Sequence, residues 1–259
     1  MKQLRTSSLI VVLSLAAAAI AAAQAGNTAP EVATIIARAQ QALVNNRAGH
    51  RPYRVFRDYK FYGENRDKVN AQVLAQVDFQ PPDTKSYVIR EASGNDRGEK
   101  LVRKMLEHER VSSRQQNDLE LSPENYDFAL LREDQRDGTR CYVVQLTPKR
   151  KEKNLLNGAM WIDANTYLIH HIEGELAKSP SFWLKEIYLK MDFSNVEGMW
   201  LRTATEAVAS VRFFGRHSML EHDVKYETAP LVASETGAKR SRIANARRVV
   251  WGTPAVVRP

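Results

Sequence analysis

The sequence lacks most of the residue patterns by which enzymes and metalloproteins are recognised. It has a single cysteine, Cys141, so it can form no internal disulfide and contains no paired-cysteine motif. Glycine-rich phosphate loops, the serine elbow of hydrolases and the zinc-binding helix motif are also missing. Cys141 begins a strand-like run and is interpreted as a small buried apolar residue rather than a reactive thiol.

The histidines and acids do not form a metal pattern either. The segment His217–His222 differs by one residue from an H-x-x-E-H motif and lies in a strand context. His170 and His171 are neighbours on a strand, so they are expected to point to opposite faces. Glu173 and Glu175 share one face, but two solvated carboxylates explain them more simply than an acid pair. No metal or cofactor is predicted.

Long hydrophobic runs are absent except near the start of the chain. Lys2 and Arg5 precede the apolar run Leu9–Ile20, which is shorter than the about 20 residues of a membrane span. Two small-residue cleavage patterns follow between residues 21 and 25. Residues 1–25 are therefore predicted to be a signal peptide cleaved near 23–25, with an uncleaved anchor as the alternative. Because no cysteine lies at that site, a lipoprotein is not predicted, and export without disulfides suits a bacterial periplasm.

Charge and composition fit a globular domain. Hydrophobic residues make up 43% and charged residues 26% of the sequence, which excludes wholesale disorder. The net charge of +8 favours anionic partners. The basic residues are interleaved with acids and form no recognisable nucleic-acid module, so no nucleic-acid partner is predicted. Residues 229–259 carry six of these cations with little periodicity and are predicted to be a mostly disordered tail. This tail could contact an anionic membrane, although a solvated tail is the simpler interpretation.

Two helices are predicted. The first covers Asn27–Asn46, with Pro30 in the first turn and Thr28 or Ala29 as its cap. Apolar residues recur along it at helical spacing (Val32, Ile35, Ile36, Ala39, Leu43). It is either an ordinary packing helix or a lid over a sheet. The second covers Gly98–Val111 and has one apolar and one charged face.

Ten short β-rich runs precede or follow the second helix in the sequence. Turn residues such as Gln80–Asp83 and Asp137–Gly138 separate them. This order predicts an antiparallel meander rather than strand-helix-strand units. The fold class is therefore α+β, with a large curved antiparallel sheet covered by two or more helices over residues 26–228. The expected strands are Tyr53–Tyr62, Val69–Phe79, Lys85–Glu91, Phe128–Arg132, Arg140–Thr147, Gly158–Asp163, Tyr167–Gly174, Ser181–Phe193, Met199–Val211 and Ser218–Tyr226.

Three segments in the second half carry a family resemblance. Gly158–Tyr167 holds a Gly-x-x-Trp-Ile-Asp hairpin, and Val196–Leu201 holds a Val-x-Gly-x-Trp-Leu hairpin. With the N-terminal helix and the helix after the third strand, they make the chain resemble the LolA-like outer-membrane lipoprotein-sorting superfamily over Pro30–Glu227. Ala177–Trp183 also resembles uncharacterised exported members. The resemblance implies a half-open β-barrel, LolA/LolB-like, whose apolar concave face holds acyl chains.

The leading hypothesis is thus a non-enzymatic periplasmic carrier or binding protein for lipoprotein acyl chains or other hydrophobic envelope ligands. One alternative is an envelope interaction module with a packed interior and a protein partner. Another is an envelope hydrolase, which a cluster of His171, Glu173 and His222 around a cleft would support. The candidate lining residues are large and apolar, and plain core packing is the simpler interpretation of each. They are Ile35, Ile36, Leu43, Trp161, Trp183, Ile187, Leu189, Trp200 and Leu220.

Overall fold

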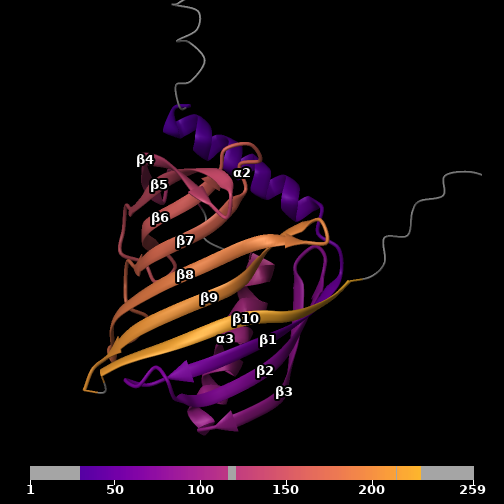
Figure 1. Cartoon of the computed structure of the whole chain (residues 1–259), viewed down its shortest axis with the longest axis vertical. Coiled ribbons are helices and arrows are strands. Elements are labelled where there is room, and N and C mark those ends of the chain that lie inside the picture. Colours follow the sequence, from indigo (N-terminus) through magenta and orange to yellow (C-terminus); the bar gives the residue numbers. More distant parts are fainter. Residues whose placement is uncertain (1–29, 116–120, 214, 229–259) are drawn as a thin grey trace, which may run out of the picture. The chain divides into compact units, whose positions relative to one another are not determined.

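A computed structural model describes residues 30–115, 121–213 and 215–228. The predicted signal peptide, the predicted caps Thr28 and Ala29 and the predicted basic tail lie outside these ranges. The described residues form two helices and one sheet (Figure 1). Neither helix combines the length and the hydropathy that crossing a membrane requires.

All ten strands belong to one antiparallel sheet with the order β3-β2-β1-β10-β9-β8-β7-β6-β5-β4. The strands β4 to β10 follow one another as a meander, and β1 then pairs with β10, so the start and end of the domain meet inside the sheet. Among the described strands only β3 and β4 are edges, and the curved sheet stays open. The strands are β1 (Tyr53–Tyr62), β2 (Val69–Gln80), β3 (Thr84–Gly94), β4 (Tyr126–Arg136), β5 (Thr139–Pro148), β6 (Leu156–Asp163), β7 (Ile169–Leu176), β8 (Leu184–Val196), β9 (Met199–Val211) and β10 (Gly215–Thr228).

The α+β class and the curved antiparallel sheet predicted from the sequence are confirmed. Several predicted boundaries are wrong. Strand β8 begins at Leu184 rather than Ser181, because residues 179–184 form a turn in which the Ser179 hydroxyl donates to backbone carbonyls. Strand β7 begins at Ile169, since Tyr167 adopts a left-handed backbone conformation in the preceding turn. Helix α2 (Val32–Ala48) begins after Glu31, which is its cap residue.

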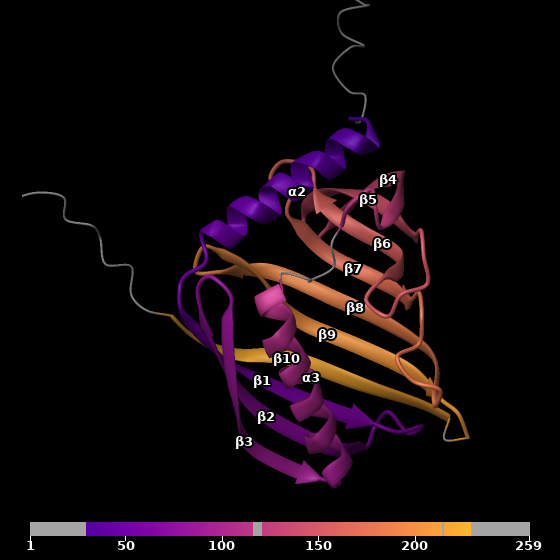
Figure 2. The same ribbon diagram turned by 180° about the vertical axis from the view of Figure 1, so that it is seen from behind.

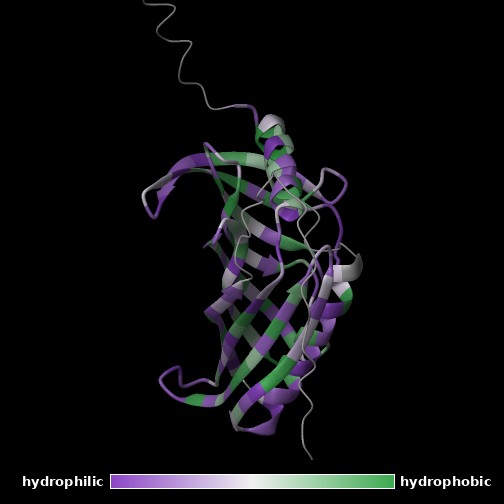
Figure 3. Cartoon of the chain, turned by 90° about the vertical axis from the view of Figure 1, so that its right-hand side faces the viewer, coloured by the Kyte–Doolittle hydropathy of each residue, from purple (hydrophilic) through white to green (hydrophobic). Residues whose placement is uncertain are grey.

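One row of paired residues shows which face of the sheet is covered. It crosses eight strands from β5 to β2 and consists of Val144, Met160, Ile172, Met191, Thr205, Glu221, Tyr59 and Val73, each paired with the next. Every member is buried. Residues paired across strands share a face, so both helices cover the same side of the sheet, as Figure 2 shows from behind. Figure 3 shows the matching alternation of hydrophobic and hydrophilic residues along the strands.

Each helix covers its own apolar cluster. Helix α2 packs Ile35, Ile36 and Ala39 onto the inner residues of β4 to β8. Helix α3 (Asp96–Gln115) packs Val102 and Leu106 onto the inner residues of β1 and β2. The row described above is therefore apolar at both ends but polar at Thr205 and Glu221 in its middle.

A buried ion network occupies this polar middle. The Arg57 guanidinium, 4% exposed, donates to Asp223 at 2.9 Å and to Glu109 of α3 at 2.7 Å. Lys85 of β3 also binds Glu109, at 2.7 Å, and Arg202 of β9 binds Glu221 at 3.1 Å. Three cations face three acids, so the network is neutral as a whole. It joins α3 to β1, β3, β9 and β10.

Burial and the neighbouring charges shift the pKa values of the acids in this network. Burial alone would raise the pKa of the Glu109 carboxyl, but the attraction of Arg57, Lys85 and Arg202 holds that pKa well below its usual range. For Asp223 burial prevails over the attraction of Arg57, and the pKa is raised. The Tyr226 hydroxyl donates to the same carboxylate.

Replacing Glu109 by glutamine should lower the free energy of unfolding by about 3 kcal/mol at neutral pH, because buried Arg57 and partly buried Lys85 then lose an anion. Urea unfolding measures this loss. The pKa of Glu109 is depressed in the folded state, so its contribution is present above the unfolded value of about 4.3 and disappears as the pH falls through the folded value. The difference in the free energy of unfolding between the wild type and Glu109→Gln should therefore become smaller as the pH is lowered.

The matched control is Glu99→Gln on the same helix. Glu99 forms an exposed pair with Arg103, and such a pair contributes about 0.5 kcal/mol or less. Equal stability losses for Glu99→Gln and Glu109→Gln would contradict the importance given to the buried network.

Candidate functional site

The structure contains an apolar cleft between helix α2 and the edge strand β4. Its volume is about 320 Å³, which lies at the lower end of the range of about 300–1,000 Å³ for small-molecule sites. Seven of its ten lining residues are apolar. The lining consists of Val32, Ala33, Ile36, Ala37, Gln40, Pro123, Tyr126, Asp127, Phe128 and Lys149.

The helical repeat explains why α2 borders this cleft. Val32, Ile36 and Gln40 recur every four residues and form one ridge, and Ala33 and Ala37 lie beside it. The neighbouring positions Ile35 and Ala39 are buried against the sheet. The side chains of Ala33 and Ala37 are too small to fill the space between α2 and β4. The cleft therefore stays open on this side of the helix.

Strand β4 supplies the opposite wall. The rings of Tyr126 and Phe128 lie 5.8 Å apart, and the Tyr126 hydroxyl accepts a hydrogen bond from the Leu156 amide at 3.1 Å. This bond satisfies the one polar atom of the Tyr126 side chain, so its ring presents an apolar surface. Since β4 is the edge strand of the sheet, no further described strand pairs with its free edge beside the cleft.

The rim of the cleft is polar. The Lys149 ammonium lies 3.4 Å from the Asp127 carboxylate, and both groups border the opening. Arg150, the next residue, donates to the backbone carbonyl of Glu124 at 3.2 Å. An apolar interior with an ion pair at its mouth suits a ligand that has a hydrocarbon chain and a polar head.

Side-chain hydrogen bonds hold α2 in place along its length. At its C-terminal end the Asn46 amide donates to the Trp200 carbonyl at 2.8 Å and accepts from the Trp200 amide at 2.9 Å. In the middle Gln40 donates to the Leu121 carbonyl at 2.8 Å, and Arg38 donates to the Tyr167 hydroxyl at 2.8 Å. The first turn, which borders the cleft, has no side-chain cap among the described contacts.

The candidate residues named from the sequence fall into several places. Ile36 lines the cleft, and Ile35 lies buried beside it. Leu43 and Leu189 pack at the border of the same apolar cluster. Ile187 lies two residues before Leu189 on β8 and is partly buried.

The remaining four lie elsewhere. Trp161 packs on Cys141 and Val143 on the opposite face of the sheet. Trp200 donates its indole N–H to the Ile169 carbonyl at 2.7 Å and contacts His170. Trp183 and Leu220 are exposed. The structure therefore does not gather the nine residues into one lining.

Sequence reasoning missed most of the cleft. Tyr126 and Phe128 are recognisable as strand residues, but no pattern shows that their strand forms the edge beside α2. Ala33 and Ala37 matter through the space they leave, which no local sequence signal reports. Only the ridge of Val32 and Ile36 follows from helical spacing.

The outer face holds a second row of paired residues that bears on the hydrolase hypothesis. It runs Val143, Trp161, His171, Asp192, Ala204, His222, Asp58 and Leu74. His171 binds Asp192 at 2.6 Å and lies 3.5 Å from Glu173. His222 lies three strands from His171, or roughly 14 Å at the usual strand spacing. The three residues therefore do not converge on one cleft.

A larger hollow of about 630 Å³ with a mixed lining lies on this outer face near β1, β2 and β3. Asp58, Gln72, Glu91 and Ser93 contribute to its lining, which makes it unsuited to an acyl chain. Within the described ranges no group of three or more His, Cys, Asp or Glu residues is placed to hold a metal ion.

Comparison with known proteins identifies the family. A family model described as "Uncharacterized protein" matches residues 87–228, from β3 through β10. This match spans more than half of the chain, so the chain belongs to that family, whose description assigns no activity. A search of curated proteins finds no significant relative.

Solved structures of three bacterial proteins are similar to this chain. A LolA superfamily protein from Nitrosomonas europaea has 12% identity and a TM-score of 0.43, covering 78% of this chain and 96% of its own. A DUF1329 family protein from Desulfovibrio piger has 13% identity and a TM-score of 0.41, covering 79% and 96%. A putative outer membrane lipoprotein-sorting protein domain from Vibrio parahaemolyticus has 13% identity and a TM-score of 0.38, covering 79% and 93%.

The only cysteine provides a test of the packing on the outer face. Cys141 is fully buried beside Val143 and Trp161, and its thiol points at the Thr139 carbonyl, 3.6 Å away. Burial, reinforced by the negative charge of Asp163, raises the pKa of this thiol to about 11. The thiolate is the reactive form, so the native protein should not react with an aromatic disulfide reagent at pH about 8, whereas the urea-unfolded protein should react fully. Rapid labelling without denaturant would contradict this packing.

Proposed function

We propose that this chain is a non-enzymatic binding protein of the cell envelope that holds the acyl chain of a lipid or lipoprotein in the cleft under α2. The observation that carries the proposal is the apolar lining of this cleft beside a polar rim formed by the Lys149–Asp127 ion pair. Burial of an acyl chain is worth about 0.8 kcal/mol per methylene. Eight methylenes would therefore contribute about 6 kcal/mol before the cost of ordering the chain, so no specific polar motif is needed.

Helix α2 acts as the adjustable wall in this proposal. Its C-terminal end is tied to β9 through Asn46, while its first turn borders the cleft. A movement of the first two turns would enlarge the cleft and expose Ile35 and Ile36 to the ligand. Leu43, Ile187 and Leu189 would then form the deeper wall. The predicted signal peptide agrees with a periplasmic location for such a protein.

A packed interaction module is the second candidate function. The row from Val144 to Val73 is buried along its whole length, and the Arg57 network occupies the centre of the covered face. These observations favour a filled interior beyond the cleft. The two candidates differ in one measurable property, which is the uptake of a hydrophobic ligand.

Native mass spectrometry of protein purified from a bacterial periplasm, followed by lipid extraction, tests the proposal. We expect near one lipid or lipopeptide per chain. Ala37→Asp should reduce the retained lipid at least tenfold, because an exposed alanine of the cleft wall becomes an anion next to the hydrocarbon.

The matched control is Val44→Asp, which places the same charge at an exposed position of α2 outside the cleft. It should retain lipid as the wild type does. An apo mass for the wild type, with no uptake of added fatty acid, would refute the binding proposal and leave the interaction module.

A further inference from the structure

Three aromatic side chains at one end of the sheet are exposed to a degree that packing does not explain. Phe182 is 71% exposed, Trp183 57% and Phe213 85%. Phe182 and Trp183 lie in the connection before β8, and Phe213 lies in the turn between β9 and β10. These three residues are called the aromatic tip below.

Contacts between the two segments hold the aromatic tip together. The Arg212 amide donates to the Trp183 carbonyl at 2.8 Å, and Leu184 pairs with Val211 at the start of β8. The Arg212 guanidinium lies over the Phe182 ring, 4.4 Å from its centre, and the rings of Phe182 and Trp183 meet edge to face at 5.8 Å. Phe182 and Trp183 are thus held against Arg212, and Phe213 is the next residue of the chain.

The fold does not need these aromatic rings. None of them belongs to an apolar cluster of the sheet. Phe213 also has a φ of 68°, in the left-handed region that is unfavourable for a bulky residue and that glycine or asparagine adopts at lower cost. A phenylalanine at this position is unfavourable for the turn and buries almost nothing, so its presence is explained better by a contact outside the chain.

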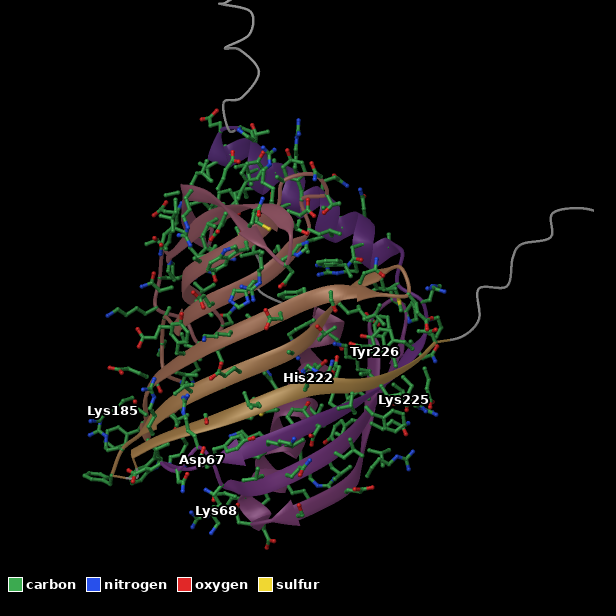
Figure 4. The ribbon with its side chains drawn as sticks, viewed as in Figure 1. Asp67, Lys68, Lys185, His222, Lys225 and Tyr226 are labelled. Atoms are coloured by element: carbon green, nitrogen blue, oxygen red, sulfur yellow. The ribbon has the colours of Figure 1, made fainter. Side chains whose placement is uncertain are left out.

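Several cations lie close to the aromatic tip in the sequence. Lys178, Lys185, Arg212 and Arg216 lie within a few residues of it along the chain, and none of them takes part in an ion pair among the described residues. Glu186 is the acid nearest to them in sequence. Figure 4 shows Lys185 at the end of the sheet where β9 and β10 meet.

The adjacent loop between β1 and β2 does not cancel the positive charge near the aromatic tip. It packs against the β9–β10 turn, where Glu64 fills the space in front of Gly215. Its two cations, Arg66 and Lys68, are matched by Glu64 and Asp67, and Figure 4 shows Asp67 and Lys68 close to this end of the sheet. The excess positive charge therefore remains with the residues around the aromatic tip.

We propose that the aromatic tip docks on an anionic phospholipid membrane. Phenylalanine and tryptophan rings favour the boundary between headgroups and acyl chains, and flanking lysines and arginines are attracted to anionic headgroups. Both components are present here, on a connection and a turn that project at the end of the strands (Figure 1). The unpaired cations favour a lipid surface over a protein partner, because charged residues are depleted from the centre of protein interfaces. This inference does not depend on the cleft under α2.

Co-sedimentation of the purified full chain with lipid vesicles tests the proposal. The test variant is Phe182→Ser/Trp183→Ser/Phe213→Asn, in which asparagine suits the left-handed position. The control variant is Val44→Ser/Val88→Ser/Val224→Ser, which removes three apolar side chains of similar exposure elsewhere on the domain. We expect wild type and control to bind vesicles of equal parts phosphatidylcholine and phosphatidylglycerol, and the test variant to bind at least tenfold less. Phosphatidylcholine alone should bind all three weakly.

Tryptophan fluorescence provides a second readout in the same samples. Anionic vesicles should shift the emission of the wild type to the blue, and Trp183→Phe should abolish the shift while Phe182 and Phe213 keep the protein bound. Thermal unfolding of the test variant should match the wild type, since the aromatic tip lies outside the core. Ala37→Asp should co-sediment with anionic vesicles as the wild type does. This result would distinguish membrane docking by the aromatic tip from acyl-chain binding in the cleft.

Three results would overturn the proposal. Equal vesicle binding by wild type and test variant would assign binding to another surface, such as residues 229–259. Absence of binding by the wild type would exclude a lipid surface. Wild-type binding that is as strong to phosphatidylcholine alone would exclude the role of the cations.

Discussion

The buried pairing of Arg57 with Glu109 and Asp223 is the constraint on which the arrangement of this domain depends. Arg57 lies on β1, Asp223 on β10 and Glu109 on α3, so one guanidinium joins the two strands that close the meander to the helix that covers them. A buried charge without partners would be strongly unfavourable. Helix α3, β1 and β10 must therefore come together in one arrangement, and Lys85 and Arg202 extend the same requirement to β3 and β9.

This network also divides the covered face into two apolar regions. Under α3 the residues of β1 and β2 are packed tightly, with Val55 and Ala75 fully buried. Under α2 the apolar region reaches the edge of the sheet at β4, and there the packing ends in a cleft. A hydrocarbon ligand cannot extend across the charged centre without separating the pairs. Space for such a ligand is consequently confined to the side of the domain that α2 covers, and this localises the proposed function.

The domain then has two surfaces of distinct chemistry. The cleft combines an apolar wall with a polar rim and is bordered by helix α2, whose C-terminal end is held to β9 through Asn46. The aromatic tip combines exposed rings with unpaired cations on the connection before β8 and the turn after β9. A protein that takes up an acyl chain from a membrane would use both, one to hold the ligand and the other to reach the lipid surface.

The sequence by itself determined the class of fold and most of its elements. Alternation in Tyr53–Tyr62 and Met199–Val211 gave strands whose bounds the structure reproduces, and the apolar stripe of Ile35, Ile36 and Ala39 gave the packing helix. These features are local, because a side chain's direction follows from the backbone period of its own segment. The hairpin residues around Trp161 and Trp200 also carried the family resemblance.

Only the tertiary structure decided which strands are neighbours and what their faces meet. Arg57, Glu109 and Asp223 are ordinary charged residues in sequence, and their meeting requires β1 to pair with β10 across most of the chain. Trp161, Trp183 and Leu220 are apolar in sequence, yet one packs on the outer face and two are exposed. The cleft depends on the small side chains of Ala33 and Ala37 lying opposite an edge strand. Burial, pairing and empty space are properties of segments brought together from distant positions, so no local pattern encodes them.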